Sequence, residues 1–484
     1  MTNGKFSILV LVLCSLFLLP SCREEQLSSD PSLKLTFSKD TVSFDTVFTT
    51  VGTSTLRLMV YNRNRNALLI NRVWLDNNTA FKVNVDGEND LTQLTDIQLN
   101  GGDSLFVFIK VFIDPNKKSA PVLIEDNLRF ELNNHNQAVH LEAVGQDVHL
   151  IKTPARLTIK ENLIFTAGKP YLIYDTVAVK GKLTIKPGAR LYFHDKAALM
   201  AYGNVNAVGS PDKPITLQGD RTDNLFEHVP YAYVAGMWSG VYLFDLSGTD
   251  TKTYDFKQVD ILSANVGLYA FSEKNTALPT MQLFNTRIHN HAVYGLVLRN
   301  INAYVVNTEI SNAAAYCAYL AGGTQRFIHT TIASYFNSTD VRIQSTPRED
   351  VAAVYINNLS KENVTTHASF QNCIIDGIRS NNLLVASPFE QYYPDTIANN
   401  FLKTDSLHVA NAIDNVYWQK SDSSVFVNTF YKYQQYQYYD FRLAEHSPAR
   451  GIADPKIAAK YKTDRNGQPR DIAKPDPGCY QSQP

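Results

Sequence analysis

The feature that most constrains the fold of this chain is a 22-residue repeat in its C-terminal half. Asn285, Asn307 and His329 follow one another at this step, and each is followed three residues later by an isoleucine. Asn372 and Ile375 continue the pattern after 43 residues, which fits either two further repeats or one repeat with a long loop. A strand-rich repeat of this length without internal helices is typical of a β-solenoid, whose stacked rungs bury a common core.

Residues in the same register are expected to stack from one rung to the next. We predict an asparagine ladder at a turn, in which the side chains of Asn285 and Asn307 each hydrogen-bond the next rung. Asp260, Arg287 and Glu309 each precede a core isoleucine, so we expect them to face outward as a negative, positive, negative ion-pair ladder. The alternative is that Arg287 serves as the base of a lyase.

The passages around the repeat extend this architecture. "GKLTIKPGARLYF" and "ALMAYGNVNAVGSPDKPITLQG" contain short strands separated by turns, and "GMWSGVYLF" opens a rung with Trp238 and Gly240. Together with the closing "DFRLAEHSPARGIAD" and "DRNGQPRDIAKPDPGCYQ", they resemble right-handed parallel β-helix proteins of the pectate-lyase superfold. The resemblance extends from about residue 154 to the C-terminus and specifies the fold better than the function. We assign 150–484 to such a β-helix with a C-terminal cap and a tyrosine-rich insertion.

Residues 33–149 show a different pattern, with short runs in which apolar and polar residues alternate. "TLRLMVYN", "SLFVFIKVFI" and "AVHLEAVGQD" are bounded by Asn, Gly and Asp, which predicts an antiparallel sandwich of roughly seven strands. "VGTSTLRLMVYNRNRNALLINRV" and "GGDSLFVFIKVF" resemble the immunoglobulin-like domains related to the sperm-protein and centrosomal families. This resemblance implies a fold and a spacer role, not an activity. The expected fold class is all-β, an immunoglobulin-like β-sandwich followed by a right-handed parallel β-helix.

Residues 1–21 have the features of a bacterial lipoprotein signal peptide. Lys5 precedes the apolar run Phe6–Leu19, which has the length of a signal-peptide core rather than of a membrane span. The run ends in "LPSC", which resembles the lipobox of bacterial lipoproteins; this implies that Cys22 is acylated, for example with palmitate, and that 22–32 form a tether. The alternative is an ordinary secretory signal with an incidental cysteine.

The charges after this cysteine bear on localisation. Arg23-Glu24-Glu25 resembles the export signal of Bacteroidetes lipoproteins that reach the outer face of the outer membrane, although a three-residue motif leaves the periplasmic face as an alternative. The net charge of −1 gives no electrostatic basis for binding nucleic acid. The expected partners are therefore the outer membrane, through the lipid anchor, and a glycan or another outer-membrane protein.

The polar residues give little support for a cofactor or a catalytic site. Cys317, Cys373 and Cys479 lack a CxxC spacing and are expected to be buried apolar residues. His289-Asn290-His291 has a ligand-like spacing but no third ligand, and we predict a turn there. Hydrolases of the superfold use neighbouring Asp residues, and its lyases use a calcium-binding carboxylate cluster with an Arg or Lys base. No Asp-Asp pair occurs in the sequence, so we predict no catalytic residue, no metal and no cofactor.

The candidate binding patch is aromatic. The segment "VYWQKSDSSVFVNTFYKYQQYQYYDF" contains five tyrosines within nine residues. If these residues form a strand, alternate rings share a face, and we expect about half of them to lie in the core. The others would form an amphipathic surface that stacks on sugar rings or anchors a protein partner. The predicted patch consists of Trp418, Tyr431, Tyr433, Tyr436, Tyr438 and Tyr439.

Three classes of function are compatible with the sequence. The favoured hypothesis is a surface lipoprotein that presents a β-helix for binding a glycan or a protein, as an accessory subunit of an outer-membrane complex. The first alternative is a polysaccharide lyase or glycoside hydrolase with an atypical site, which a groove with three carboxylates would support. The second is a structural adhesin or stalk without a groove or an aromatic patch.

Overall fold

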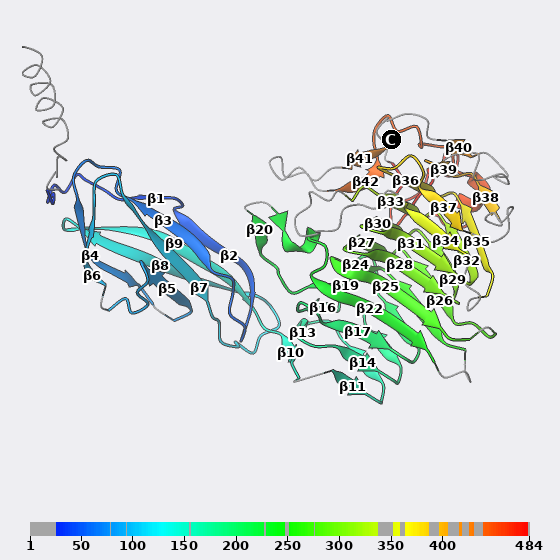
Figure 1. The fold of residues 1–484 in the computed structure, drawn as a ribbon, viewed down its shortest axis with the longest axis horizontal. Coiled ribbons are helices and arrows are strands. Elements are labelled where there is room, and N and C mark those ends of the chain that lie inside the picture. Colours follow the sequence, from blue (N-terminus) through cyan, green and yellow to red (C-terminus); the bar gives the residue numbers. More distant parts are fainter. Residues whose placement is uncertain are drawn as a thin grey trace, which may run out of the picture. The chain divides into compact units, whose positions relative to one another are not determined.

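The computed structural model describes residues 26–77, 79–92, 94–153, 156–226, 229–246, 251–274, 276–336, 352–358, 364–386, 396–404, 416–418, 425–429 and 439–482. The chain forms two compact units, one of Met1–Asn116 with Pro121–Gln146 and one of Lys117–Ala120 with Asp147–Pro484 (Figure 1). The expected all-β fold class is confirmed: a β-sandwich is followed by a right-handed parallel β-helix.

The N-terminal unit is a sandwich of two sheets. One sheet has the order β1 (Thr36–Phe37), β3 (Leu56–Tyr61), β7 (Ser104–Val111), β5 (Phe81–Val85). The other has the order β2 (Thr41–Phe48), β9 (His135–Gln146), β8 (Val122–Leu132), β4 (Leu68–Leu75), β6 (Thr95–Leu99). All pairs are antiparallel except β2 with β9. Alternate side chains of β7, such as Val107 and Ile109, point into the core and are fully buried, as the period-two pattern requires.

The C-terminal unit is a solenoid of three parallel sheets. The first solenoid sheet contains β10 (His149–Ile151), β13 (Tyr171–Ile173), β16 (Arg190–Phe193), β19 (Ile215–Gly219), β24 (Val259–Leu262), β27 (Arg287–His291), β30 (Glu309–Ala313), β33 (Thr331–Ser334), β36 (Ile374–Gly377), β39 (Phe401–Leu402) and β40 (Tyr417–Trp418). The second contains β11 (Leu157–Ile159), β14 (Val177–Val179), β17 (Ala198–Ala201), β22 (Trp238–Asp245), β25 (Ala264–Ser272), β28 (Tyr294–Arg299), β31 (Tyr316–Ala321), β34 (Val354–Asn357) and β37 (Leu383–Ala386). The third contains β12 (Leu163–Phe165), β15 (Leu183–Ile185), β18 (Val205–Val208), β23 (Thr253–Lys257), β26 (Thr280–Phe284), β29 (Asn302–Val306), β32 (Gly323–Ile328), β35 (Thr366–Gln371) and β38 (Thr396–Ala398).

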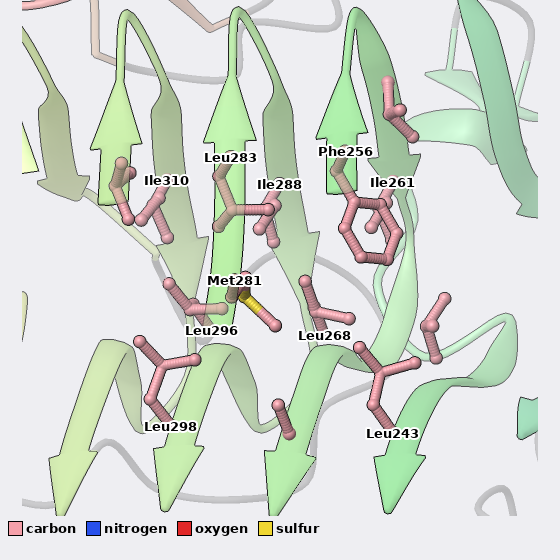
Figure 2. Close-up of a cluster of buried hydrophobic side chains, with 14 of the residues drawn as sticks. Leu243, Phe256, Ile261, Leu268, Met281, Leu283, Ile288, Leu296, Leu298 and Ile310 are labelled. Atoms are coloured by element: carbon pink, nitrogen blue, oxygen red, sulfur yellow. The ribbon is translucent and has the colours of Figure 1, made fainter. Parts of the chain in front are cut away.

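The repeat isoleucines form a column inside the solenoid. Ile288 pairs with Ile310, Ile310 with Ile332, and Ile332 with Ile375. All four are buried, with at most 1% of each exposed. Because β33 pairs directly with β36, the 43-residue interval is one rung with long connections rather than two rungs. Figure 2 shows Ile288 and Ile310 of this column packing against leucines of the second sheet, such as Leu296, and of the third, such as Leu283.

The repeat asparagines mark a tight turn between the third and first sheets. Asn285, Asn307, His329 and Asn372 have φ angles between 47° and 52°, a left-handed conformation that asparagine tolerates better than most residues. The backbone N–H of each donates to a carbonyl of the next rung, as from Asn285 to Val306 at 3.1 Å. The predicted turn is therefore confirmed.

The predicted side-chain ladder is wrong at Asn307. Its amide nitrogen donates to the carbonyl of Thr463 at 2.9 Å, and its amide oxygen accepts from Arg470 at 2.8 Å. Both partners belong to the C-terminal passage, which satisfies the side chain in place of the next rung. A side-chain hydrogen bond between rungs does join Asn372 to His329, at 3.0 Å.

Residues 449–482, here called the C-terminal strap, run along the side of the solenoid. The strap includes the short helix α2 (Pro455–Ala458) and contacts rungs that lie far apart in the sequence. Arg465 binds Asp260, Tyr480 donates to Glu309, and Gly478 donates its N–H to Asn372. Beside the strap, β41 (Phe426–Asn428) and β42 (Asp440–Leu443) form an antiparallel pair that packs on Ile374 and Phe401. The outer face of the first sheet is thus covered over these rungs.

Two shorter features complete the fold. β20 (Asn224–Phe226) and β21 (Val229–Pro230) form a small antiparallel pair, followed by the 3-10 turn η1 (Tyr231–Tyr233). Among the residues that the structure describes, no helix has the length and hydrophobicity needed to cross a membrane.

Candidate functional site

The structure places two members of the predicted aromatic patch. Trp418 ends the column of repeat isoleucines, because it pairs with Leu402, and it packs partly against the solenoid core. Tyr439 packs beside the ring of Phe441 at 6.0 Å and donates its hydroxyl to the carbonyl of Tyr335 at 3.5 Å. The remaining members, Tyr431, Tyr433, Tyr436 and Tyr438, lie outside the described residues, and so does the predicted lipidation site Cys22.

The three cysteines in the described part of the chain are buried without disulfide bonds. Cys317, Cys373 and Cys479 are each fully enclosed, as predicted for small apolar side chains. Burial raises the pKa of each thiol to about 12, so none of the three is a reactive thiolate at neutral pH.

A second aromatic surface lies on the outer face of the second solenoid sheet, where the sequence pattern had not led us to expect one. Alternate residues of β22, β25, β28, β31 and β34 point away from the core, and most of these are aromatic. We call this surface the tyrosine face. It consists of Tyr202, Tyr242, Phe244, Tyr269, Phe271, Tyr294, Tyr316, Tyr319 and Tyr355, all of them half-buried.

The rings of the tyrosine face pack against one another from rung to rung. The ring of Tyr316 lies 4.8 Å from that of Tyr355, with 17° between their planes, and 6.2 Å from that of Tyr294. The strand register sets this arrangement, because Tyr294 pairs with Tyr316 and Tyr319 pairs with Tyr355. Such packing holds the rings in place, and each ring remains partly exposed.

Polar side chains border the tyrosine face. The amide of Asn357 donates to the hydroxyl of Tyr319 at 2.7 Å, and Arg156 donates to the hydroxyl of Tyr202 at 2.8 Å. The guanidinium of Arg299 lies 5.0 Å from the centre of the Phe271 ring and 3.4 Å from the hydroxyl of Tyr269. The face therefore combines apolar ring area with hydrogen-bonding groups.

A cleft of 380 Å³ lies over the outer face of the first solenoid sheet, between that sheet, β42 and the C-terminal strap. We call it the side cleft. Its lining residues are Arg287, His289, Glu309, Tyr439, Asp440, Phe441, Arg442, Arg465, Asn466 and Tyr480. Four positions that the sequence singled out, Arg287, His289, Glu309 and Tyr439, thus come together with strap residues that no local pattern connects to them.

Of the predicted ion-pair ladder, the described residues show only the step from Asp260 to Arg287, and Glu309 pairs elsewhere. The Nε atom of Arg287 lies 3.8 Å from Asp260, whose carboxylate is also bound by Arg465. Burial opposes the charge on Arg287, but Asp260 and Glu309 outweigh it and raise the pKa of the guanidinium above its ordinary value. Arg287 is therefore a charged guanidinium in the folded protein.

Glu309 is buried rather than exposed, because the strap covers it; its exposed fraction is 4%. One carboxylate oxygen accepts from the hydroxyl of Ser311 at 2.5 Å, and the other accepts from the hydroxyl of Tyr480. Since the Ser311 hydroxyl has one proton, His289 must donate from Nδ1 to Ser311, at 2.8 Å. Nε2 of His289 is then a hydrogen-bond acceptor.

His289 and His291 have different hydrogen-bond partners. Burial, and then the charge of Arg287, lower the pKa of His289 to about 3, so this ring is neutral and its 3.6 Å approach to Glu309 is not an ion pair. His291 is fully buried and accepts the N–H of Ala264 at 3.2 Å. The turn predicted here is wrong, because His289, Asn290 and His291 all lie within β27, although Asn290 has a left-handed φ of 65°. The described residues contain no group of three His, Cys, Asp or Glu side chains arranged to hold a metal ion.

Comparisons with known proteins identify no family. The chain matches no family model and no curated protein. Similar segments occur in the VesB protease of Vibrio cholerae (15% identity, 23% of this chain and 31% of that chain, TM-score 0.17). They also occur in the YadV chaperone (11% identity, 25% of this chain and 55% of that chain, TM-score 0.17). A family 123 glycoside hydrolase from Clostridium perfringens is a further case (6% identity, 27% of this chain and 30% of that chain, TM-score 0.19). The chain covers only 30% to 55% of these structures, and TM-scores this low support no conclusion about fold or function.

Proposed function

We propose that this protein is a glycan-binding lipoprotein of the outer membrane, anchored through Cys22 and facing the cell exterior. In this proposal the sandwich is an immunoglobulin-like spacer and the β-helix presents the binding surface, as part of an outer-membrane complex. The observation that carries the proposal is the tyrosine face. Its rings form two packed groups on one parallel sheet, one around Tyr242 and Tyr269 and one around Tyr316 and Tyr355. Sites on regular elements hold their side chains more precisely than loops do.

The chemistry of the tyrosine face favours a glycan over a protein partner. A stable protein interface centres on apolar side chains that become fully buried. Here the rings are already half-buried against one another, so they offer edges and hydroxyl groups rather than a large apolar area. A sugar chain needs this combination, because it has apolar C–H surfaces and many hydroxyl groups that form hydrogen bonds.

A screen of purified protein against a panel of neutral and acidic polysaccharides tests the proposal. We expect at least one polysaccharide to be retained, with no new reducing ends and no unsaturated uronate absorbance after incubation. Appearance of either product, lost in the Arg287→Ala variant, would favour the lyase or hydrolase alternative. Failure to retain any glycan, combined with specific copurification of an outer-membrane protein, would favour a protein partner.

A further inference from the structure

We infer that the side cleft is a binding site for a small carboxylic acid, whose carboxylate is held by Arg287 beside Arg465. This inference concerns a second site and a different class of ligand, and it does not depend on glycan binding by the tyrosine face.

The first observation is an arginine without hydrogen bonds. Within the described part of the chain, the guanidinium of Arg287 makes only the 3.8 Å approach to Asp260, which is too long for a hydrogen bond. Its Nε is enclosed without a partner, while 27% of the side chain remains exposed where it lines the cleft. Leaving such donors unpaired is costly, and a planar carboxylate satisfies a guanidinium through two parallel hydrogen bonds.

The charged groups beside Arg287 have partners of their own. Arg442 is paired with Asp440, and Arg465 with Asp260. Both oxygens of Glu309 accept hydrogen bonds from hydroxyl groups, of Ser311 and Tyr480, rather than from Arg287. Asp260, Glu309 and Asp440 match the three arginines in number, so the unused hydrogen-bond donors of Arg287, rather than a surplus of positive charge, favour a carboxylate.

The other residues that line the side cleft indicate the chemistry of the rest of the ligand. The rings of Tyr439 and Phe441 lie 6.0 Å apart with 8° between their planes, which gives an aromatic wall for a flat or ring-shaped body. The neutral His289 offers Nε2 as an acceptor for a ligand hydroxyl. A cleft of 380 Å³ is near the lower end of the range for small-molecule sites, which fits a ligand of one ring rather than a polymer.

Matched acids and amides test this inference, because the two members of each pair differ only in the carboxylate. We would titrate the purified full chain with 4-hydroxybenzoate and 4-hydroxybenzamide, and with glucuronate and glucuronamide, by calorimetry. The expected result is that at least one acid binds ten-fold or more tightly than its amide. Equal affinities in both pairs, or no binding by either acid at millimolar concentration, would overturn the inference.

Two variants of the same residue locate the site. Arg287→Gln should abolish the preference for the acid, and Arg287→Lys, which keeps the charge but not the paired hydrogen bonds, should retain part of it. Arg129→Gln in the sandwich, which removes an arginine that is bound to Asp76, is the control and should bind like the wild type. An unchanged preference in a folded Arg287→Gln protein would contradict the inference. The Tyr316→Ala/Tyr355→Ala protein should keep the preference, so that failure of the glycan proposal and failure of this one are distinguishable.

Discussion

At the scale of single residues, the structure contains a buried acid that makes stability depend on pH. Asp376 on β36 is fully buried; it accepts the hydroxyl of Tyr335 at 2.9 Å and the N–H of Gly377 at 2.8 Å. Burial raises its pKa from 3.8 to about 6, against the opposing effect of these hydrogen bonds and of Lys403. The folded state therefore binds the proton of this carboxyl group more tightly than the unfolded state does.

The raised pKa predicts the sign of the pH effect. The protonated acid stabilises the fold below about pH 4, and this contribution is lost as the pH rises through 6, with a magnitude of about 3 kcal/mol. Asp376→Asn removes the titrating group while keeping an oxygen for the N–H of Gly377. In denaturant unfolding, the stability difference between wild type and variant should be constant below pH 4 and should shift in favour of the variant above pH 6. A stability difference that does not change between pH 4 and pH 8 would mean that Asp376 does not titrate in this range.

At the scale of elements, the rungs depend on the isoleucine column. Ile310 is fully buried between Ile288 and Ile332, so Ile310→Asp places an unpaired charge in the solenoid core. We expect a loss of several kcal/mol in the free energy of unfolding, measured with denaturant. Ile378→Asp is the matched control, because Ile378 is 55% exposed, and it should change stability little. Comparable stability of the two variants would show that the column does not hold the rungs together.

The same scale shows what the sequence could and could not predict. Ile288 and Ile310 were predictable because core positions recur with the period of the rung. Tyr294 and Tyr316 carry the same 22-residue signal, so part of the tyrosine face was visible in the repeat. The side cleft was not, since it forms when Tyr480 meets Glu309 across 171 residues. A contact of this kind has no periodicity and depends on how the strap packs.

At the scale of the whole molecule, the proposed lipid anchor determines where any binding surface operates. Cells that express wild type or Cys22→Ala are labelled with a radioactive fatty acid, and the protein is then immunoprecipitated. We expect label in the wild type and none in the variant, because a lipoprotein carries its acyl chains on this cysteine. Label that persists in Cys22→Ala would refute acylation at this position.

Glycan binding by the tyrosine face, on which the proposed function depends, can be tested through one ratio of dissociation constants. For a polysaccharide that the wild type retains, the constant of Tyr316→Ala/Tyr355→Ala is compared with that of Tyr61→Ala, which removes a half-buried tyrosine of the sandwich. Removing two contact rings should weaken binding by about 1–2 kcal/mol for each, roughly thirty-fold or more for the pair. We expect this loss in a variant that remains folded, and wild-type binding by Tyr61→Ala. Equal dissociation constants for the two folded variants would contradict glycan binding at this face.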